Sequence, residues 1–116
     1  MPPESAVQLG LMTGVPPFPA EGQVDLANWE YPPYNRWGFQ HVRELVPTAN
    51  ISRGPGKPWA LKRAERDLDG LTLSIGGSRS IDFPAFLDET YTDGILVLHR
   101  GKVVLERYLN GMRPET

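Results

Sequence analysis

The stretch that decides the fold is Ile95-Leu96-Val97-Leu98-His99-Arg100-Gly101-Lys102-Val103-Val104-Leu105-Glu106-Arg107-Tyr108. It opens with four successive apolar residues, a run that predicts a strand buried on both faces. Arg100-Gly101 predicts the turn, either as a tight two-residue loop or with a bulge at Gly101. The return strand ends in charged residues, which favours a place nearer the sheet edge. The stretch therefore predicts an antiparallel hairpin that needs cover on both sides.

The composition of the chain limits what it can be. With 116 residues it is at most one small domain, and its 12 Gly and 12 Pro leave little material for a dense core. We therefore expect the chain to pack onto something larger. The absence of Cys excludes disulfides, cysteine zinc sites and thiol nucleophiles. A net charge of −2 without a basic stripe argues against nucleic acid as a partner.

The sequence gives no sign of a membrane or export segment. No run approaches the ~20 apolar residues that a bilayer span needs. The first five residues, Met1–Ser5, also lack the basic region of a signal peptide. We therefore expect no membrane contact and a cytoplasmic location.

Residues 1–36 are predicted to form an extended, proline-rich arm. Pairs such as Pro16-Pro17 and Pro32-Pro33 stop helices and keep the preceding residue extended. The arm is nevertheless too apolar for typical disorder, and its aromatic residues can anchor it on the surface of a larger body. The expected anchors are Trp29, Tyr31 and Tyr34.

Short elements are expected between the arm and the hairpin, which makes the fold class α+β. Asp82 is predicted to cap a helix that has Pro84 in its first turn and an apolar face of Phe83, Phe86, Leu87 and Tyr91. The other predicted elements are a helix over 36–46 capped by Asn35, a strand over 48–53, a helix over 59–68, and a small hairpin of 71–75 with 79–81.

No catalytic motif is complete within the chain. None of Ser5, Ser52, Ser74, Ser78 and Ser80 is followed by Lys three residues later, the spacing that places both side chains on one helix face. The two histidines, His41 and His99, are expected to pack or to lie in a turn. They lack metal-ligand spacing, and the acidic residues do not fit a calcium loop.

Several segments together resemble one known family. They are Trp29–Trp37, His41–Pro47, Asn50–Arg53, Thr90–Gly94 and Glu106–Gly111. With the hairpin stretch, they are similar to the leading part of 6-aminohexanoate-dimer hydrolases and related esterases, a branch of the β-lactamase-like serine hydrolases.

The resemblance implies the N-terminal part of a β-lactamase-like, or penicillin-binding-protein-like, fold. Residues 37–116 would then hold the first helices and first sheet hairpin of a domain that is incomplete at its C-terminus. The nucleophile would lie in a Ser-x-x-Lys motif just beyond Thr116. We therefore expect no catalytic, cofactor-binding or metal-binding residue in this chain and no cofactor. Tyr108-Leu109-Asn110 matches the family's Tyr-x-Asn box only formally, because in the family that box follows the nucleophile.

Two functions from different classes remain open at this point. The favoured one is a non-catalytic N-terminal segment of a serine hydrolase that acts on amide or ester bonds, such as 6-aminohexanoate amides or small carboxylic esters. Its partners would be the C-terminal remainder of the hydrolase, as the same or a companion chain, and a small amide or ester substrate in the complete protein. A homodimer is also allowed. The alternative is a stand-alone small structural or protein-interaction domain without enzymatic activity.

Overall fold

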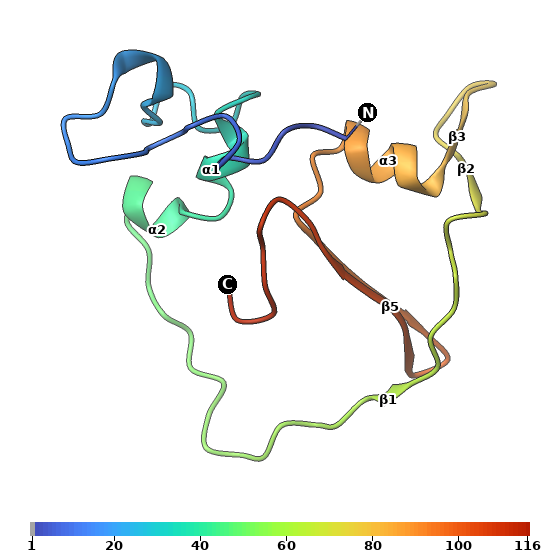
Figure 1. Cartoon of the computed structure of the whole chain (residues 1–116). Helices are drawn as coiled ribbons and strands as arrows, with labels where there is room; N and C mark the ends of the chain where they lie inside the picture. Colours follow the sequence, from blue (N-terminus) through green and yellow to red (C-terminus); the bar gives the residue numbers. More distant parts are fainter. Residues whose placement is uncertain (1) are drawn as a thin grey trace. The chain divides into compact units, whose positions relative to one another are not determined.

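The computed structural model describes residues 2–116 and divides into two compact units (Figure 1). The sheet unit comprises residues 2–3 and 57–114, and the loop unit comprises residues 4–56 and 115–116. Helices and strands both occur, so the α+β class is confirmed. Among residues 2–116, no helix combines the length and apolar character needed to cross a membrane.

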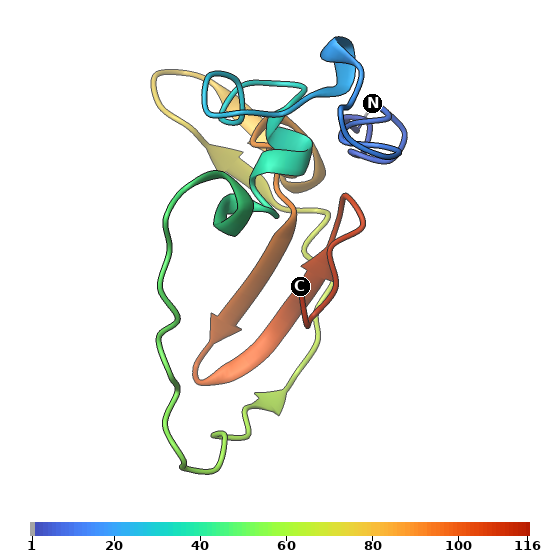
Figure 2. The ribbon, with the colours of Figure 1, turned by 90° about the vertical axis from the view of Figure 1, so that its left-hand side faces the viewer.

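The predicted hairpin forms the centre of the sheet unit (Figure 2). Strand β4 (Gly94–His99) pairs antiparallel with β5 (Lys102–Tyr108). The turn is the tight two-residue loop, because His99 pairs directly with Lys102 and both turn residues have positive φ, 51° at Arg100 and 75° at Gly101. Turns with two positive φ angles match the twist of the flanking strands, and glycine adopts this conformation without a steric cost.

A bulge lies within the hairpin rather than at Gly101. Val97 pairs with Leu105 and Leu98 pairs with Val103, so Val104 is the extra residue on β5. A bulge sets two residues of one strand against one of its partner. Its consequence is that neighbouring Val103 and Val104 are both buried, with 3% and 4% of their surface exposed.

The prediction of an inner first strand and an outer return strand is wrong within this chain. Strand β1 (Lys62–Arg63) pairs parallel with β5, which gives the order β1-β5-β4. The charges of β5 are accommodated there because its Glu106 and Arg107 form ion pairs with neighbouring segments. β4 is at the edge, and its Leu96 and Leu98 remain 53% and 50% exposed.

The second predicted hairpin and its helix are confirmed. β2 (Thr72–Ser74) pairs antiparallel with β3 (Ser80–Asp82), and α3 (Phe83–Glu89) follows at once. The Asp82 side chain accepts a hydrogen bond from Ala85 N at 2.8 Å, as expected for an N-cap. The helix has buried Phe83 and Leu87 on its apolar face, whereas Phe86 and Tyr91 are only partly buried.

The predicted helix over 59–68 is wrong, because this segment is extended. Its Ala64 and Arg66 amides donate to the carbonyls of Val103 and Val104, at 2.8 and 2.9 Å. Hydrogen bonds to the edge of β5 thus replace those that a helix would make internally. Trp59 has no place in the core and is 91% exposed.

The loop unit holds η1 (Ala20–Gly22), α1 (Asn35–Gly38) and α2 (Val42–Leu45). The single helix predicted over 36–46 is therefore broken in two. Gly38 sits so close to Trp29 that an added Cβ would lie 2.6 Å from the Trp29 carbonyl oxygen. α1 ends at Gly38, and only glycine, which has no Cβ, tolerates so close an approach to Trp29.

No strand forms over 48–53 in the described structure, and Ile51 is 95% exposed. The segment has no strand to pair with, and an unpaired strand gains no ladder of hydrogen bonds.

Residues 2–34 contain one regular element, η1, within the described chain, as expected for an irregular arm, but the predicted extended form is wrong. The arm is folded on itself, since Arg36 is buried and its Nε donates to the Glu4 carbonyl at 3.0 Å. Trp29 packs edge-on against Phe39 with ring centres 6.2 Å apart, whereas Tyr31 is exposed. The attachment of residues 1–36 to a larger body, and the division at residue 37, stay predictions.

Candidate functional site

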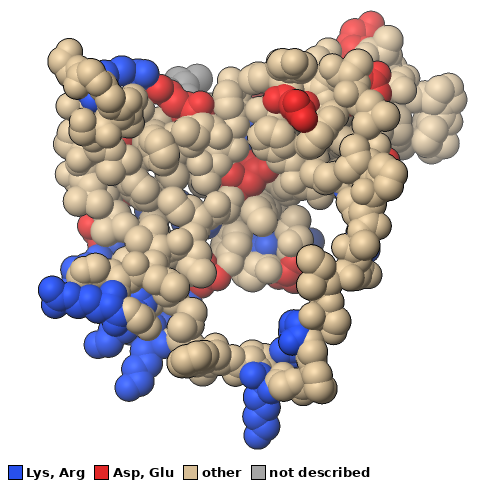
Figure 3. Space-filling model, turned by 180° about the vertical axis from the view of Figure 1, so that it is seen from behind, with Lys and Arg blue, Asp and Glu red and all other residues tan. Residues whose placement is uncertain are grey.

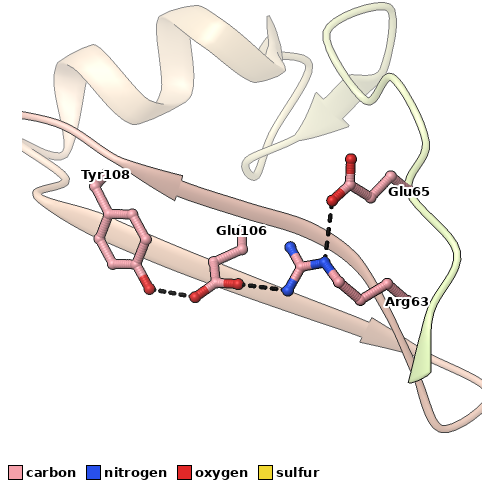
Figure 4. Close-up of polar contacts among 4 residues, drawn as sticks. All are labelled: Arg63, Glu65, Glu106 and Tyr108. Carbon is pink, nitrogen blue, oxygen red and sulfur yellow. Dashed lines mark hydrogen bonds and ion pairs between the residues drawn. The ribbon is translucent and has the colours of Figure 1, made fainter. Parts of the chain in front are cut away.

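The most connected polar cluster joins Tyr108, Glu106 and Arg63 on the sheet (Figure 4). Glu106 and Tyr108 are two residues apart on β5, so their side chains share a face. The Tyr108 hydroxyl donates to one carboxylate oxygen of Glu106. Arg63 Nη1 donates to the other, Oε2, at 2.7 Å, and Arg63 Nε donates to Glu65 Oε1 at 3.0 Å. Two segments, residues 63–65 and β5, are thus tied together by one arginine and one carboxylate.

The electrostatics of this cluster fix its protonation. The hydrogen bond from Tyr108, followed by that from Arg63, holds the pKa of Glu106 below its ordinary value. The carboxylate of Glu106 likewise raises the pKa of Arg63. At neutral pH Glu106 is therefore an ionised acceptor, and Tyr108 serves as a donor to it. Such a cluster can orient the strands but offers no group poised to take a proton.

The Tyr108-Leu109-Asn110 stretch closes the open end of the hairpin. Tyr108 is the last residue of β5. Leu109 N donates to the Asp93 carbonyl at 2.7 Å, and the Asn110 side-chain amide donates to Asp93 Oδ1 at 3.0 Å. These two hydrogen bonds join the chain just after β5 to Asp93, the residue just before β4.

The hydroxyls of Ser5 and Ser52 serve local turns. Ser5 Oγ accepts from Gln8 N at 3.3 Å, and Ser52 Oγ accepts from Gly54 N at 3.0 Å. Ser74 and Ser80 form a register pair in the small hairpin, with Ser78 in its loop. Hydroxyls held in this way lack the adjacent base that activates a serine nucleophile.

The two histidines lie in different units and have different surroundings. His41 stacks on Trp37 with ring centres 4.0 Å apart, and its Nδ1 lies 2.7 Å from the Trp37 carbonyl oxygen. His99 is exposed at the end of β4. Within residues 2–116, no group of three His, Asp or Glu side chains is arranged to hold a metal ion.

A pocket of about 340 Å³ in the sheet unit is lined by Pro3, Asp88, Glu89 and Tyr91. Arg79 Nη2 bonds to both carboxylate oxygens of Glu89 at 2.8 Å. Among residues 2–116, the lining contains two carboxylates and a phenol and no serine, lysine or histidine, so these residues lack the parts of a nucleophilic site.

Sequence reasoning missed the Arg63–Glu106 contact and the pocket. The helix predicted over 59–68 includes Arg63, and 43 residues separate Arg63 from Glu106. The pocket brings the start of the chain next to α3. No local sequence pattern predicts the Arg63–Glu106 contact or the proximity of the chain start to α3.

Comparison with known proteins gives a consistent relationship. The chain is 37% identical over 100 residues to the 6-aminohexanoate-dimer hydrolase of Paenarthrobacter ureafaciens, which covers 85% of this chain and 24% of that enzyme. The chain is related to one part of 6-aminohexanoate-dimer hydrolases. The chain thus spans about a quarter of the length of this curated relative.

A solved structure supports the same relationship. It is a Bacillus anthracis protein provisionally assigned as a 6-aminohexanoate-dimer hydrolase, with a TM-score of 0.60 and 30% identity. The match covers 72% of this chain and 22% of the solved one. No family model matches the chain.

Proposed function

We propose that this chain is a non-catalytic, N-terminal segment of a serine hydrolase that cleaves amide or ester bonds. The observation that carries the proposal is the 37% identity that spans 85% of this chain but only 24% of a 6-aminohexanoate-dimer hydrolase. In the complete protein, 6-aminohexanoate-type amides or small carboxylic esters would be the substrates. The cytoplasmic location stays a prediction.

The exposed surface of the hairpin supports this reading. Leu96 and Leu98 lie on one face of β4 and are each about half exposed, and the outer edge of β4 has no partner strand in the described chain. A β-lactamase-like arrangement would cover the face and extend the sheet at that edge. Two exposed leucines beside an open edge invite aggregation unless something covers them.

The proposed chemistry places the reacting groups outside this chain. In the complete hydrolase, a serine of a Ser-x-x-Lys motif would attack the carbonyl and form an acyl-enzyme, while lysine and tyrosine side chains move the proton. Backbone amides would stabilise the oxyanion. This segment would hold the sheet behind that site, with the Tyr108–Glu106–Arg63 cluster fixing β5 to β1.

A chimaera tests the proposal directly. In the Paenarthrobacter enzyme, the 100 aligned residues would be exchanged for the matching residues of this chain. We expect the chimaera to fold and to hydrolyse 6-aminohexanoate dimer, while the same enzyme with the stretch deleted does not. A chimaera that folds by circular dichroism but hydrolyses nothing would contradict the proposal.

The chain alone supplies the complementary test. We expect no hydrolysis of p-nitrophenyl butyrate by the 116-residue chain. Turnover that a serine-directed inhibitor abolishes would show that a nucleophile is present after all. A monomer that melts cooperatively and independently of concentration would favour the alternative, a stand-alone interaction domain.

A further inference from the structure

Basic side chains form a row across the three-stranded sheet at its turn end. Lys62 of β1 pairs with Lys102 of β5, and Lys102 pairs with His99 of β4. Directly opposed residues of neighbouring strands project from the same face, so these three side chains lie side by side. Arg100, in the adjoining turn, adds a fourth basic group. We call His99, Arg100, Lys102 and Lys62 the basic tip.

The basic tip has no acidic partner in the described chain. All four residues are exposed, and no ion pair joins them to a carboxylate among residues 2–116. Arg63, Arg79 and Arg107 of the same unit are each paired with a carboxylate. Lys and Arg side chains gather where β1 and the hairpin turn lie, at the lower left of Figure 3.

The pairing of Lys62 with Lys102 runs against sheet stability. Like charges directly opposite one another on neighbouring strands are destabilising. The nearby Arg63–Glu106 pair shows that the same two strands also accommodate opposite charges. A charge arrangement that costs stability and has no internal counterion is explained by an anionic group that binds from outside.

We propose that the basic tip is a docking surface for an acidic protein segment. Neighbouring strands are about 4.8 Å apart, so the row from Lys62 to His99 spans about 10 Å. An extended peptide covers that span with about three residues, and carboxylates at positions i and i+2 project to the same side. Two acidic side chains of one short segment can therefore reach both lysines at once.

Charge and composition favour a protein over the other polyanions. The whole chain carries 14 acidic against 12 basic residues, so its overall field opposes a long polyanion such as nucleic acid. A short acidic segment needs only the local positive field. The inference rests on this sheet alone and holds whether or not the hydrolase assignment is correct.

The test uses a fluorescein-labelled octaglutamate peptide titrated with the full chain and followed by fluorescence anisotropy at low salt. The variant is Lys62→Gln with Lys102→Gln, and the matched control is Arg53→Gln with Lys57→Gln, which removes two exposed cations elsewhere. Exposed ion pairs are each worth a factor of about 1.4 to 5, so loss of two should make the tip variant bind about 2- to 25-fold more weakly. The control should change affinity by less than about twofold, and added salt should weaken binding.

Two further readouts complete the test. In an NMR titration of the unsubstituted chain, the amide signals of residues 62 and 99–102 should shift most when the peptide is added. This readout does not depend on whether a variant folds. If the tip variant and the control lose peptide affinity equally, the effect comes from net charge alone, and the proposal is overturned. It is also overturned if an eight-nucleotide DNA or phosphatidylserine vesicles bind the tip more tightly than the peptide, or if the amide shifts lie elsewhere.

Discussion

Removal of the Asp82 cap is the perturbation whose effect the structure defines most closely. Asp82 immediately precedes α3, and its carboxylate accepts a hydrogen bond from Ala85 N at 2.8 Å. Without this acceptor, one amide of the first turn loses its partner in the protein. Pro84 lies in that same turn and lacks an amide hydrogen, so Asp82 carries much of the capping.

The size of the effect follows from the geometry of the cap. Replacement of an N-cap Asp by Ala costs about 1 kcal/mol, whereas Asn caps nearly as well as Asp. For a folded body of the size of residues 57–114, about 1 kcal/mol lowers Tm by roughly 4–8 °C. The same free energy lowers the protection of α3 amides against hydrogen exchange by about fivefold, if they exchange by opening of the helix.

Asp82→Ala and Asp82→Asn should therefore be compared by thermal melting and by hydrogen exchange at Ala85 and Leu87. The Asn variant controls for the place of Asp82 in β3, opposite Thr72, because it keeps the cap and changes only the charge. Equal destabilisation by both variants would mean that strand pairing or charge, rather than capping, is what Asp82 supplies.

Four other outcomes are expected. Leu87→Ala, at a site 2% exposed, should cost about 2–5 kcal/mol in urea unfolding, while Leu26→Ala, at a site 66% exposed, should cost far less. Gly101→Ala should destabilise the hairpin by about 1 kcal/mol, measured in the same way, because φ is 75° there. Tyr108→Phe removes the larger cause of the low pKa of Glu106, so a carboxyl-carbon NMR titration should show that pKa rise. Because the folded pKa is the lower one, Glu106 should contribute stability above its unfolded pKa and lose it as pH falls through the folded pKa, and the Phe variant should show less of this loss.

The elements that the sequence predicted correctly depend on neighbours in the chain. The β4–β5 hairpin needs only its apolar runs and a turn residue that tolerates positive φ, and Gly101 supplies the latter. Helix α3 begins directly after Asp82, with Pro84 in its first turn, as the sequence pattern predicts. Both signals act over about four residues, which is the range that a sequence pattern reports reliably.

The helix wrongly predicted over 59–68 failed because this segment pairs with a partner far along the chain. The spacing of Leu61, Ala64 and Leu68 fits one helix face, and no alternation of apolar and polar residues in this segment indicates a strand. The Ala64 and Arg66 amides find acceptors at Val103 and Val104, and these hydrogen bonds decide the outcome. The Arg63–Glu106 ion pair depends on the same long-range contact, so it could not be predicted once a helix was expected.

This misassigned segment bears on how the proposed hydrolase would be assembled. Because residues 62–66 occupy the β5 edge near the turn, a strand from elsewhere in the protein could not pair there without displacing them. The opposite edge of the sheet is formed by β4, which is open in the described chain and flanked by the half-exposed Leu96 and Leu98. If the remainder of a hydrolase extends this sheet, β4 is therefore where its strand would pair. β4 is an edge strand in this chain, but we expect it to be an inner strand in the complete protein.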